Sequence, residues 1–228
     1  MAAPAVAHGP LDTPARVSRD EGLKHRAMRR VALPWLVALW LLASALGSGL
    51  LWSHASTAGP SATPPSRLPE ALAPVRRPGT WSLLVFLHPQ CPCSRATLAE
   101  LAKLTAHAGR RLATRVFIWA PRQAPPDFVR SELWTRAQAL SGVEVVADVD
   151  GQAARAMGAR TSGQVVLFSP EGIERFSGGI TPARGHEGDS EGNRTLRALV
   201  DTQAPGSPVA PVFGCALETP PRPTGETP

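Results

Sequence analysis

Two cysteines separated by one proline, Cys91-Pro92-Cys93, are the residues of this sequence best suited to chemistry. They follow the apolar run Leu83 to Leu87, which is short enough for a buried strand and is closed by His88-Pro89. An Ala/Leu-rich segment with helical spacing comes next. Pro92 suits the first helical position, whose N–H has no partner within the helix. The free N–H groups and the dipole at that point favour a thiolate, which is the reactive form of cysteine.

This pair predicts either redox or metal chemistry. Thiol–disulfide exchange needs a thiolate, an accessible disulfide and a second thiol nearby, and His88 could stabilise the thiolate or relay its proton. A disulfide across one residue closes a tight ring, which makes the bond easier to reduce. Alternatively, Cys91, Cys93 and His88 form a soft ligand set that suits copper or zinc. A structural disulfide or two unreactive thiols are the remaining interpretations.

A second unusual stretch lies between 176 and 193, where glycines alternate with charged or coordinating side chains, namely Arg184, His186, Glu187 and Asp189. These side chains could shape a site or hold a ligand, although their spacing matches no helical zinc motif. The alternative is a solvated Gly-rich loop in which Asn193 caps the last helix.

Cys215 lies in a small apolar island, 211–217, within a Pro-rich tail. A tail that folds back could dock Val212, Phe213 and Leu217 on the domain, bring Cys215 near the thiol pair and let it resolve a mixed disulfide. A buried or merely unpaired cysteine is the alternative.

The uncharged run 31–52 is long enough to span a bilayer, with Trp35 and Trp52 near its ends. Basic residues precede it, so the N-terminus is expected in the cytoplasm and the rest of the chain outside. A cleaved signal peptide, with small residues around Ala58, is the competing interpretation. All three cysteines follow this run and would lie where disulfides persist, and an odd count there suggests an exchanging thiol.

The 228 residues divide by composition into a tail, an anchor, a linker, a domain and a second tail, with bounds 1–30, 31–52, 53–79, 80–202 and 203–228. The first tail lacks apolar periodicity and is expected to be disordered, and the Pro/Ala-rich linker is expected to act as a tether. Half of the formal charge of +6 lies in the first thirty residues, and no basic stripe with interleaved aromatics is present, which argues against a nucleic-acid partner.

Within the domain, apolar runs alternate with helical patterns. Strands are expected at Leu83–Leu87, 113–119, 143–147, 165–168 and 173–176, and helices after the cysteine pair, after Pro125, at 153–157 and near 195–200. Asp148 is expected to stop a strand and cap a helix. The order implies an α/β fold with a mixed sheet flanked by helices.

This order, with a cysteine pair after the first strand, resembles the thioredoxin-like superfamily, in particular its membrane-anchored, exported bacterial members of the cytochrome-maturation and redoxin type. The segment 148–172 matches their Asp-x-Asp-Gly, short helix, glycine, strand and hairpin pattern. The His-Pro-x-Cys-Pro-Cys and Arg-Gly-His-Glu-Gly-Asp pieces are similar to those of small bacterial proteins labelled RedB. The resemblance covers about Trp81 to Asp201.

The resemblance implies that Cys91 attacks and Cys93 resolves. It also implies a substrate groove between the cysteine turn and two glycine-containing segments, lined by Pro92, Ser162, Gly163, Gly178 and Gly179. Two features depart from the family: one residue separates the cysteines instead of two, and Gly163 stands where the family has a cis-proline.

The function expected from the sequence is that of a thiol–disulfide oxidoreductase without a cofactor, anchored by a single span in the inner membrane with its domain in the periplasm. Its partners would be exported thiol proteins or a membrane electron donor. A copper-binding metallochaperone is the first alternative, although related copper chaperones separate their cysteines by three residues. A redox-inactive thioredoxin-like binding module is the second.

Overall fold

A computed structural model describes residues 17–75, 78–202 and 208–218 of the chain, with side chains described from Leu33 onward. The chain divides into two compact units, with the boundary between Trp52 and Ser53. The first unit is helical, and the second contains the sheet and all three cysteines.

The described part of the first unit is the helix α1 (Val17–Ser56), whose last residues, 53–56, are counted with the second unit. Its segment Leu33–Ser56 is long and apolar enough to cross a membrane, and it fits either a single span or a signal sequence. We expected residues 1–30 to lack structure. The structure corrects this for 17–30, which belong to α1, whereas 1–16 lie outside the described residues.

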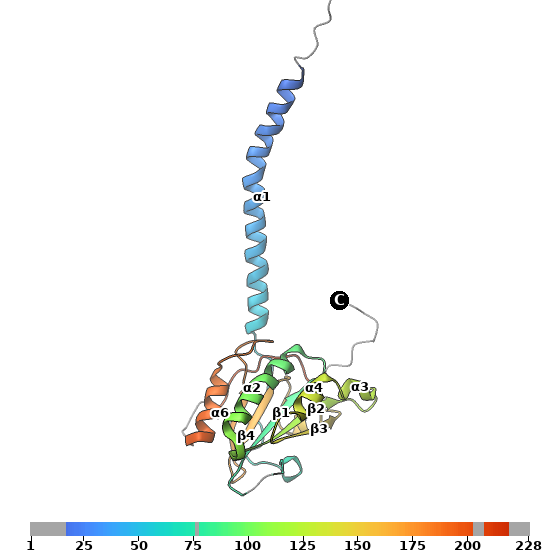
Figure 1. The fold of residues 1–228 in the computed structure, drawn as a ribbon, viewed down its shortest axis with the longest axis vertical. Helices are drawn as coiled ribbons and strands as arrows, with labels where there is room; N and C mark the ends of the chain where they lie inside the picture. The colour runs from blue at the N-terminus through green and yellow to red at the C-terminus, as the bar shows by residue number, and fades with distance from the viewer. Residues whose placement is uncertain (1–16, 76–77, 203–207, 219–228) are drawn as a thin grey trace, which may run out of the picture. The chain divides into compact units, whose positions relative to one another are not determined.

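A five-stranded mixed sheet forms the centre of the second unit (Figure 1). Its order is β3-β2-β1-β4-β5, with strands β1 (Trp81–Leu87), β2 (Leu112–Ala120), β3 (Val143–Val149), β4 (Gln164–Phe168) and β5 (Glu174–Gly179). The first three strands are parallel, and β4 and β5 are antiparallel to their neighbours. Every residue of β1 is buried, because both faces of the central strand are covered. The α/β fold with a mixed sheet is therefore confirmed.

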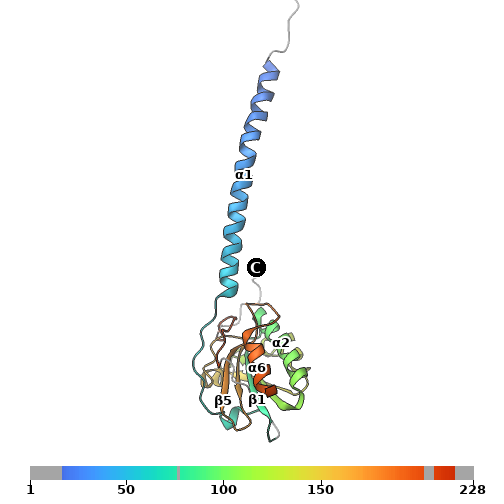
Figure 2. The ribbon, with the colours of Figure 1, turned by 90° about the vertical axis from the view of Figure 1, so that its left-hand side faces the viewer.

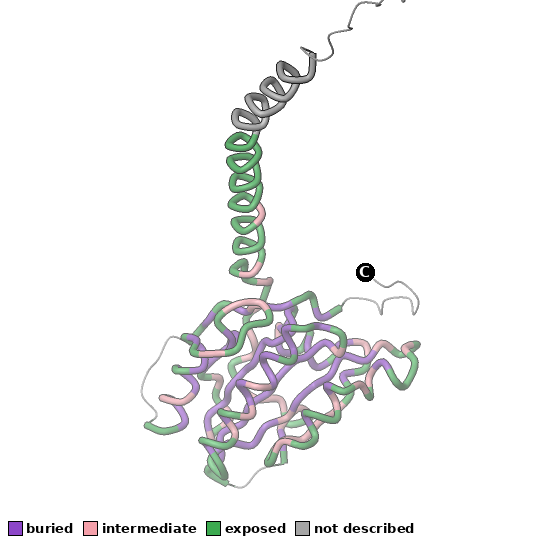
Figure 3. Tube along the Cα trace, turned by 45° about the horizontal axis from the view of Figure 1, so that its top comes forward, coloured by how far each residue is buried: buried purple, intermediate pink, exposed green. Residues whose placement is uncertain are grey.

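Helices cover the two faces of the sheet unequally (Figure 1). The buried stretches of the second unit lie in its interior, with exposed residues on the outside (Figure 3). The larger core lies between the sheet and α2 (Pro92–Ala108), α4 (Glu132–Gln138) and α6 (Glu191–Thr202). The smaller core takes α3 (Pro126–Val129) and α5 (Gln152–Ala156). Alternate residues of β1 feed the two cores, with Leu83 and Val85 in one and Leu84 and Phe86 in the other.

Two predicted elements differ in detail. The single helix expected after Pro125 is split into α3 and α4, because Arg130 and the extended Ser131 interrupt it. Asp148 caps α5 as expected, since its carboxylate accepts hydrogen bonds from the N–H groups of Ala153 and Ala154 at 2.8 and 2.9 Å. It does not end the strand, because β3 continues to Val149. Two 3₁₀ turns, η1 (Glu70–Leu72) and η2 (Gly109–Arg111), complete the elements.

The Pro/Ala-rich segment 53–79, which we expected to be a tether, lies along the domain over much of its length (Figure 2). The N–H of Ala62 donates to the carbonyl of Gly158 at 2.9 Å, and the N–H of Leu68 donates to the carbonyl of Gly172 at 2.9 Å. Leu68 and Leu72 pack against the smaller core. Two leucines and a few backbone bonds thus hold a segment whose composition suggested a free linker.

The packing of this segment can be tested at Gly158, which has a φ of +65°. A Cβ added at Gly158 would lie 2.5 Å from the carbonyl oxygen of Ala62. Gly142 is the matched control, with φ +75 and nothing within 4 Å of an added Cβ. We expect Gly142→Ala to lower the free energy of unfolding by about 1 kcal/mol and Gly158→Ala by about 2–3 kcal/mol. Denaturant unfolding measures both, and equal losses would show that Ala62 does not pack on Gly158.

Candidate thiol site

The cysteine pair lies where β1 ends and α2 begins. Cys91 is the residue that precedes the first turn of α2, Pro92 follows it as the first helical residue, and Cys93 is the next residue in the helix. Both cysteines are buried, whereas Pro92 is exposed. Cys215 joins them from the C-terminal segment: all three cysteines are free, and their sulfur atoms lie within 4.8 Å of one another.

Hydrogen bonds make Cys91 the anionic member of this cluster. The largest cause is the bond donated by the Cys93 thiol, and the thiol and N–H of Cys215 and the N–H of Cys93 also donate to the Cys91 sulfur. Together these donors outweigh the effect of burial and lower the pKa of Cys91 from 9.0 to about 4. Reduced Cys91 is therefore a thiolate at neutral pH.

The two other cysteines are held as thiols by the same interactions. The bond to Cys91 and burial raise the pKa of Cys93 above its ordinary value. Burial raises the pKa of Cys215 to about 11, the bond to Cys91 adds to the shift, and the positive charge of Arg184 opposes it. The cluster therefore holds one nucleophile and two proton donors.

A ring of hydrogen bonds fixes the start of α2 against β4. The hydroxyl of Ser94 donates to the carbonyl of His88 at 2.8 Å, and the N–H of His88 donates to the hydroxyl of Ser162 at 2.9 Å. The two hydroxyls lie 2.8 Å apart, and since the Ser94 proton points to His88, Ser162 donates to Ser94. Each donor in the ring has one acceptor, which positions Cys91 on its helix rigidly.

His88 is buried in an aromatic setting. Its ring stacks on Trp119 with centroids 5.2 Å apart and meets the edge of Phe128 at 5.9 Å. The N–H of Gln90 donates to its Nδ1 at 3.1 Å, so the proton of the neutral ring is on Nε2. The main causes of the Cys91 shift are the other two cysteines. A proton-relay role for His88 stays a prediction.

The C-terminal segment 208–218 folds back over the end of the sheet that carries the cysteines. The N–H of Ser162 donates to the carbonyl of Cys215 at 2.8 Å, and the N–H of Leu217 donates to the carbonyl of Arg160 at 2.9 Å. These bonds flank an antiparallel bridge between Thr161 and Ala216. The segment therefore pairs with the residues before β4 as a short strand would.

The glycines that we expected to line a substrate groove lie beneath this segment. Gly178 and Gly179 approach the backbone of Ala210 and Pro211 so closely that an added Cβ would lie 2.5 and 2.6 Å from their carbonyl oxygens. Gly163 has φ +96, a conformation that proline cannot adopt, and its N–H donates to the carbonyl of Phe86 at 2.8 Å. The predicted groove is thus filled by the protein's own chain.

The charged loop before α6 supports the site without joining the cysteine cluster. The guanidinium of Arg184 donates to the carbonyl of Gly214, next to Cys215, and the N–H of Gly185 bonds to the sulfur of Cys93. Glu187 forms an ion pair with Lys103 at 3.6 Å on the surface. His186 and Asp189 are exposed, and among the described residues the group suited to a metal ion holds the three cysteines alone.

Glu100 ties this loop to α2 and was not predicted from the sequence. Its buried carboxylate accepts bonds from the N–H of Gly188 at 2.8 Å, the side-chain amide of Asn193 at 3.0 Å and Lys103 at 2.8 Å. Asn193 was expected to cap the last helix, but Ser190 accepts the bond from the N–H of Asn193 instead. Ser94, Trp119 and Phe128 were also missed, and no spacing signal marks them, since their partners lie far away in the sequence.

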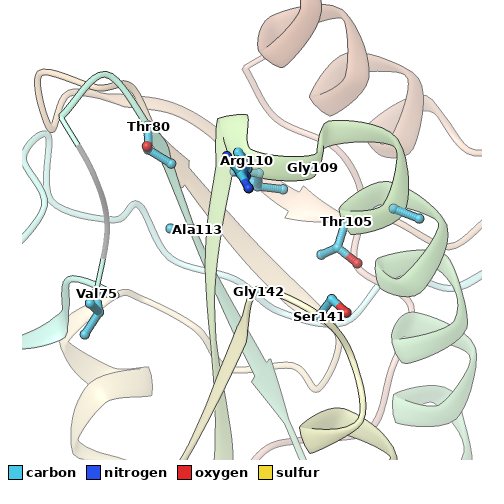
Figure 4. A pocket seen from close by; sticks show the side chains of 10 residues that line it. Val75, Thr80, Thr105, Gly109, Arg110, Ala113, Ser141 and Gly142 are labelled. Atoms are coloured by element: carbon cyan, nitrogen blue, oxygen red, sulfur yellow. The ribbon is translucent and has the colours of Figure 1, made fainter.

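A cavity of about 470 Å³ lies at the other end of β1, near Thr80, Gly109 and Ser141 (Figure 4). Its described lining is small and weakly polar, and among those lining residues Arg110 is the charged one. It brings together no nucleophile or acid–base pair, so the cysteine cluster remains the candidate site.

Comparison with known proteins supports the fold. No family profile matches the sequence, and no curated protein does. A hypothetical protein from Sinorhizobium meliloti has a similar structure, with a TM-score of 0.57, 22% identity, and coverage of 71% of this chain and 97% of that one. An uncharacterised conserved protein from Geobacillus kaustophilus has a TM-score of 0.53 and 15% identity, and the match covers 73% of this chain and 94% of that one.

Other similar structures carry thioredoxin names. An exposed lipoprotein thioredoxin from Streptococcus pneumoniae has a TM-score of 0.40 and 19% identity, covering 54% of this chain and 87% of that one. At these identities the likeness concerns the fold alone. The two structures with TM-scores above 0.5 therefore show a shared mixed α/β fold, and no activity is carried over from any of these proteins.

The ionisation of Cys91 predicts a distinct pH profile. At pH values below the pKa of an ordinary thiol, the fraction present as thiolate rises about tenfold for each unit of pH. The ultraviolet thiolate absorbance of the reduced protein should instead be nearly constant from pH 6 to 8 and fall near pH 4, and Cys91→Ala should remove it. A wild-type signal that appears only above pH 8 would contradict this assignment.

The same shift predicts how stability depends on pH. The pKa of Cys91 is lower in the folded state than its ordinary value of 9.0. The contribution of its thiolate to the free energy of unfolding is therefore complete above pH 9 and is lost as the pH falls to about 4. Between these values, the melting temperature of the reduced wild type should rise with pH relative to that of Cys91→Ala.

Proposed function

We propose that this protein is a thiol–disulfide oxidoreductase in which Cys91 attacks and Cys93 resolves. The observation that carries the proposal is the cluster itself, in which a donor-stabilised Cys91 sulfur lies within 4.8 Å of two other thiol sulfurs. Exchange requires a thiolate and a second thiol at such range, and a purely structural cysteine needs neither.

The reaction uses only groups that the chain supplies. The Cys91 thiolate attacks one sulfur of a partner disulfide, whose other sulfur leaves as a thiolate and takes a proton. Cys93 then loses its proton and attacks the Cys91 sulfur, which forms the Cys91–Cys93 bond and releases the second partner thiol. The partner gains two electrons and the protein loses two. The reverse sequence oxidises a partner dithiol.

The proposal includes a location. The apolar segment Leu33–Ser56 would anchor the chain in the inner membrane, and the basic residues before it would keep the N-terminus in the cytoplasm. The domain would then face the periplasm, where disulfides persist and exported thiol proteins or a membrane electron donor are available. No cofactor is needed for the exchange.

Trapping of mixed disulfides tests the reaction. Since the sulfurs of Cys93 and Cys215 both lie within 4.8 Å of the Cys91 sulfur, both resolving thiols must be removed. We expect the double variant Cys93→Ser/Cys215→Ser to accumulate protein adducts through Cys91, detected on non-reducing gels and by mass spectrometry. The control adds Cys91→Ser, which should abolish the adducts. A double variant without adducts would contradict the proposal and favour a redox-inactive binding module.

A copper-binding role is the second candidate, favoured by the same three sulfurs. Three thiolates at this separation suit a soft ion such as Cu(I). Cys215 takes the place that we expected for His88 in the ligand set. Reduced protein loaded with Cu(I) should then retain about one ion per chain, and Cys215→Ser should lose it while His88→Ala retains it. Metal-free protein after dialysis would exclude this role.

A further inference from the structure

The three clustered cysteines differ in their access to solvent. Cys91 is 3% exposed and Cys93 is 6% exposed, whereas Cys215 is an exposed residue. Pro92 separates the buried pair, and the C-terminal segment lies across the groove beside it. In this conformation Cys215 is the cysteine that lies at the surface, although its sulfur packs against the other two, whereas Cys91 and Cys93 are largely covered.

The chain holds Cys215 firmly on both sides. Before it, the carbonyl of Gly214 accepts a bond from Arg184. At Cys215 itself, the carbonyl accepts the N–H of Ser162, and after it Leu217 is 1% exposed in the smaller core. These contacts on either side hold the Cys215 thiol in one place relative to Cys91. A tail that only covered the site would not require its cysteine to be fixed in this way.

We propose that Cys215 is the thiol that meets the protein partner, and that it relays the disulfide between the partner and Cys91. The proposal rests on the oxidoreductase function above and adds the route to it. The exchange with the partner is then carried out by a residue that is remote in sequence from the Cys91–Cys93 pair.

The relay balances for a protein that starts with the Cys91–Cys93 disulfide. Cys215 loses its proton and attacks the Cys91 sulfur, so that the Cys91–Cys215 bond forms and Cys93 leaves and takes the proton. A partner thiolate then attacks the Cys215 sulfur, and Cys91 leaves as a thiolate. A second partner thiol attacks the partner sulfur bound to Cys215, which completes the partner disulfide and restores the Cys215 thiol. The partner loses two electrons and the protein gains two.

The surroundings of the Cys91–Cys215 bond favour attack at Cys215. Cys215 is an exposed residue, whereas Cys91 is buried, so the Cys215 side of the bond faces an incoming thiolate. The N–H of Cys93 at the helix N-terminus also remains available to stabilise Cys91 as it leaves. A well-stabilised leaving thiolate speeds exchange.

The competing idea is that the segment 208–218 is only a cover that must lift before a partner reaches Cys91. The two ideas predict opposite effects of weakening the segment. If it is a cover, removing Cys215 or loosening Leu217 raises the rate of exchange with a protein partner. If Cys215 is the relay, both changes lower it.

The site of attack can be mapped on the oxidised full-length protein in detergent. Glutathione is added, the reaction is quenched with acid and an alkylating agent, and the adduct is located by mass spectrometry. We expect glutathione on Cys215 and a free, alkylated Cys91. An adduct on Cys91 or Cys93 with Cys215 unmodified would overturn the relay alone, whereas no adduct at any cysteine would overturn the proposed function with it.

Kinetics with a reduced protein dithiol give the second measurement. Cys215→Ser should slow oxidation of the dithiol by about tenfold or more, and Leu217→Ala should also slow it. Val209→Ala is the matched control, because Val209 lies in the same segment, is 61% exposed and pairs with Ser177 through its backbone. Its rate should equal that of the wild type. Faster exchange in Cys215→Ser and Leu217→Ala would overturn the relay and establish a cover.

Discussion

A charge withdrawn from water must find hydrogen-bond donors inside the protein, because an unpaired buried charge is strongly destabilising. The Cys91 thiolate meets this requirement from two sources. Cys93 supplies donors from the first turn of α2, as a helix N-terminus does for any anion, and Cys215 supplies the others from the far end of the chain. The features around the site follow from the second source. Arg184 holds the segment that carries Cys215, Glu100 holds the loop that carries Arg184, and Ser162 pairs with that segment while its hydroxyl holds His88.

The part of the site that is local in sequence could be predicted. An apolar strand, a proline suited to the first helical position and a helical repeat follow one another between Trp81 and Ala108, and their patterns identified the thiol pair and its place at the start of α2. The same holds for the order of strands and helices along the chain and for the cap at Asp148, since each depends on runs or neighbours a few residues apart.

The parts that could not be predicted depend on pairing between distant segments. The segment around Ala62 is rich in proline and poor in apolar residues, so composition assigned it to a linker. The apolar island around Cys215 indicated that the tail could fold back, but not which residues it pairs with. Both segments are held by backbone bonds and by a few leucines, such as Leu68 and Leu217, that complete the smaller core. A free backbone edge leaves no mark in the side-chain pattern, which also explains why the groove looked open from the sequence.

The pairing of Cys215 with the residues before β4 also sets an order of assembly. A ribosome makes Cys91 and Cys93 more than one hundred residues before Cys215, and the strands between them can join the sheet while the last segment is still absent. During that interval the nascent chain carries an uncovered thiol pair that lacks half of the donors for its thiolate. The finished site therefore appears only after Cys215 has been made, so that folding of the sheet precedes completion of the thiolate's donor set.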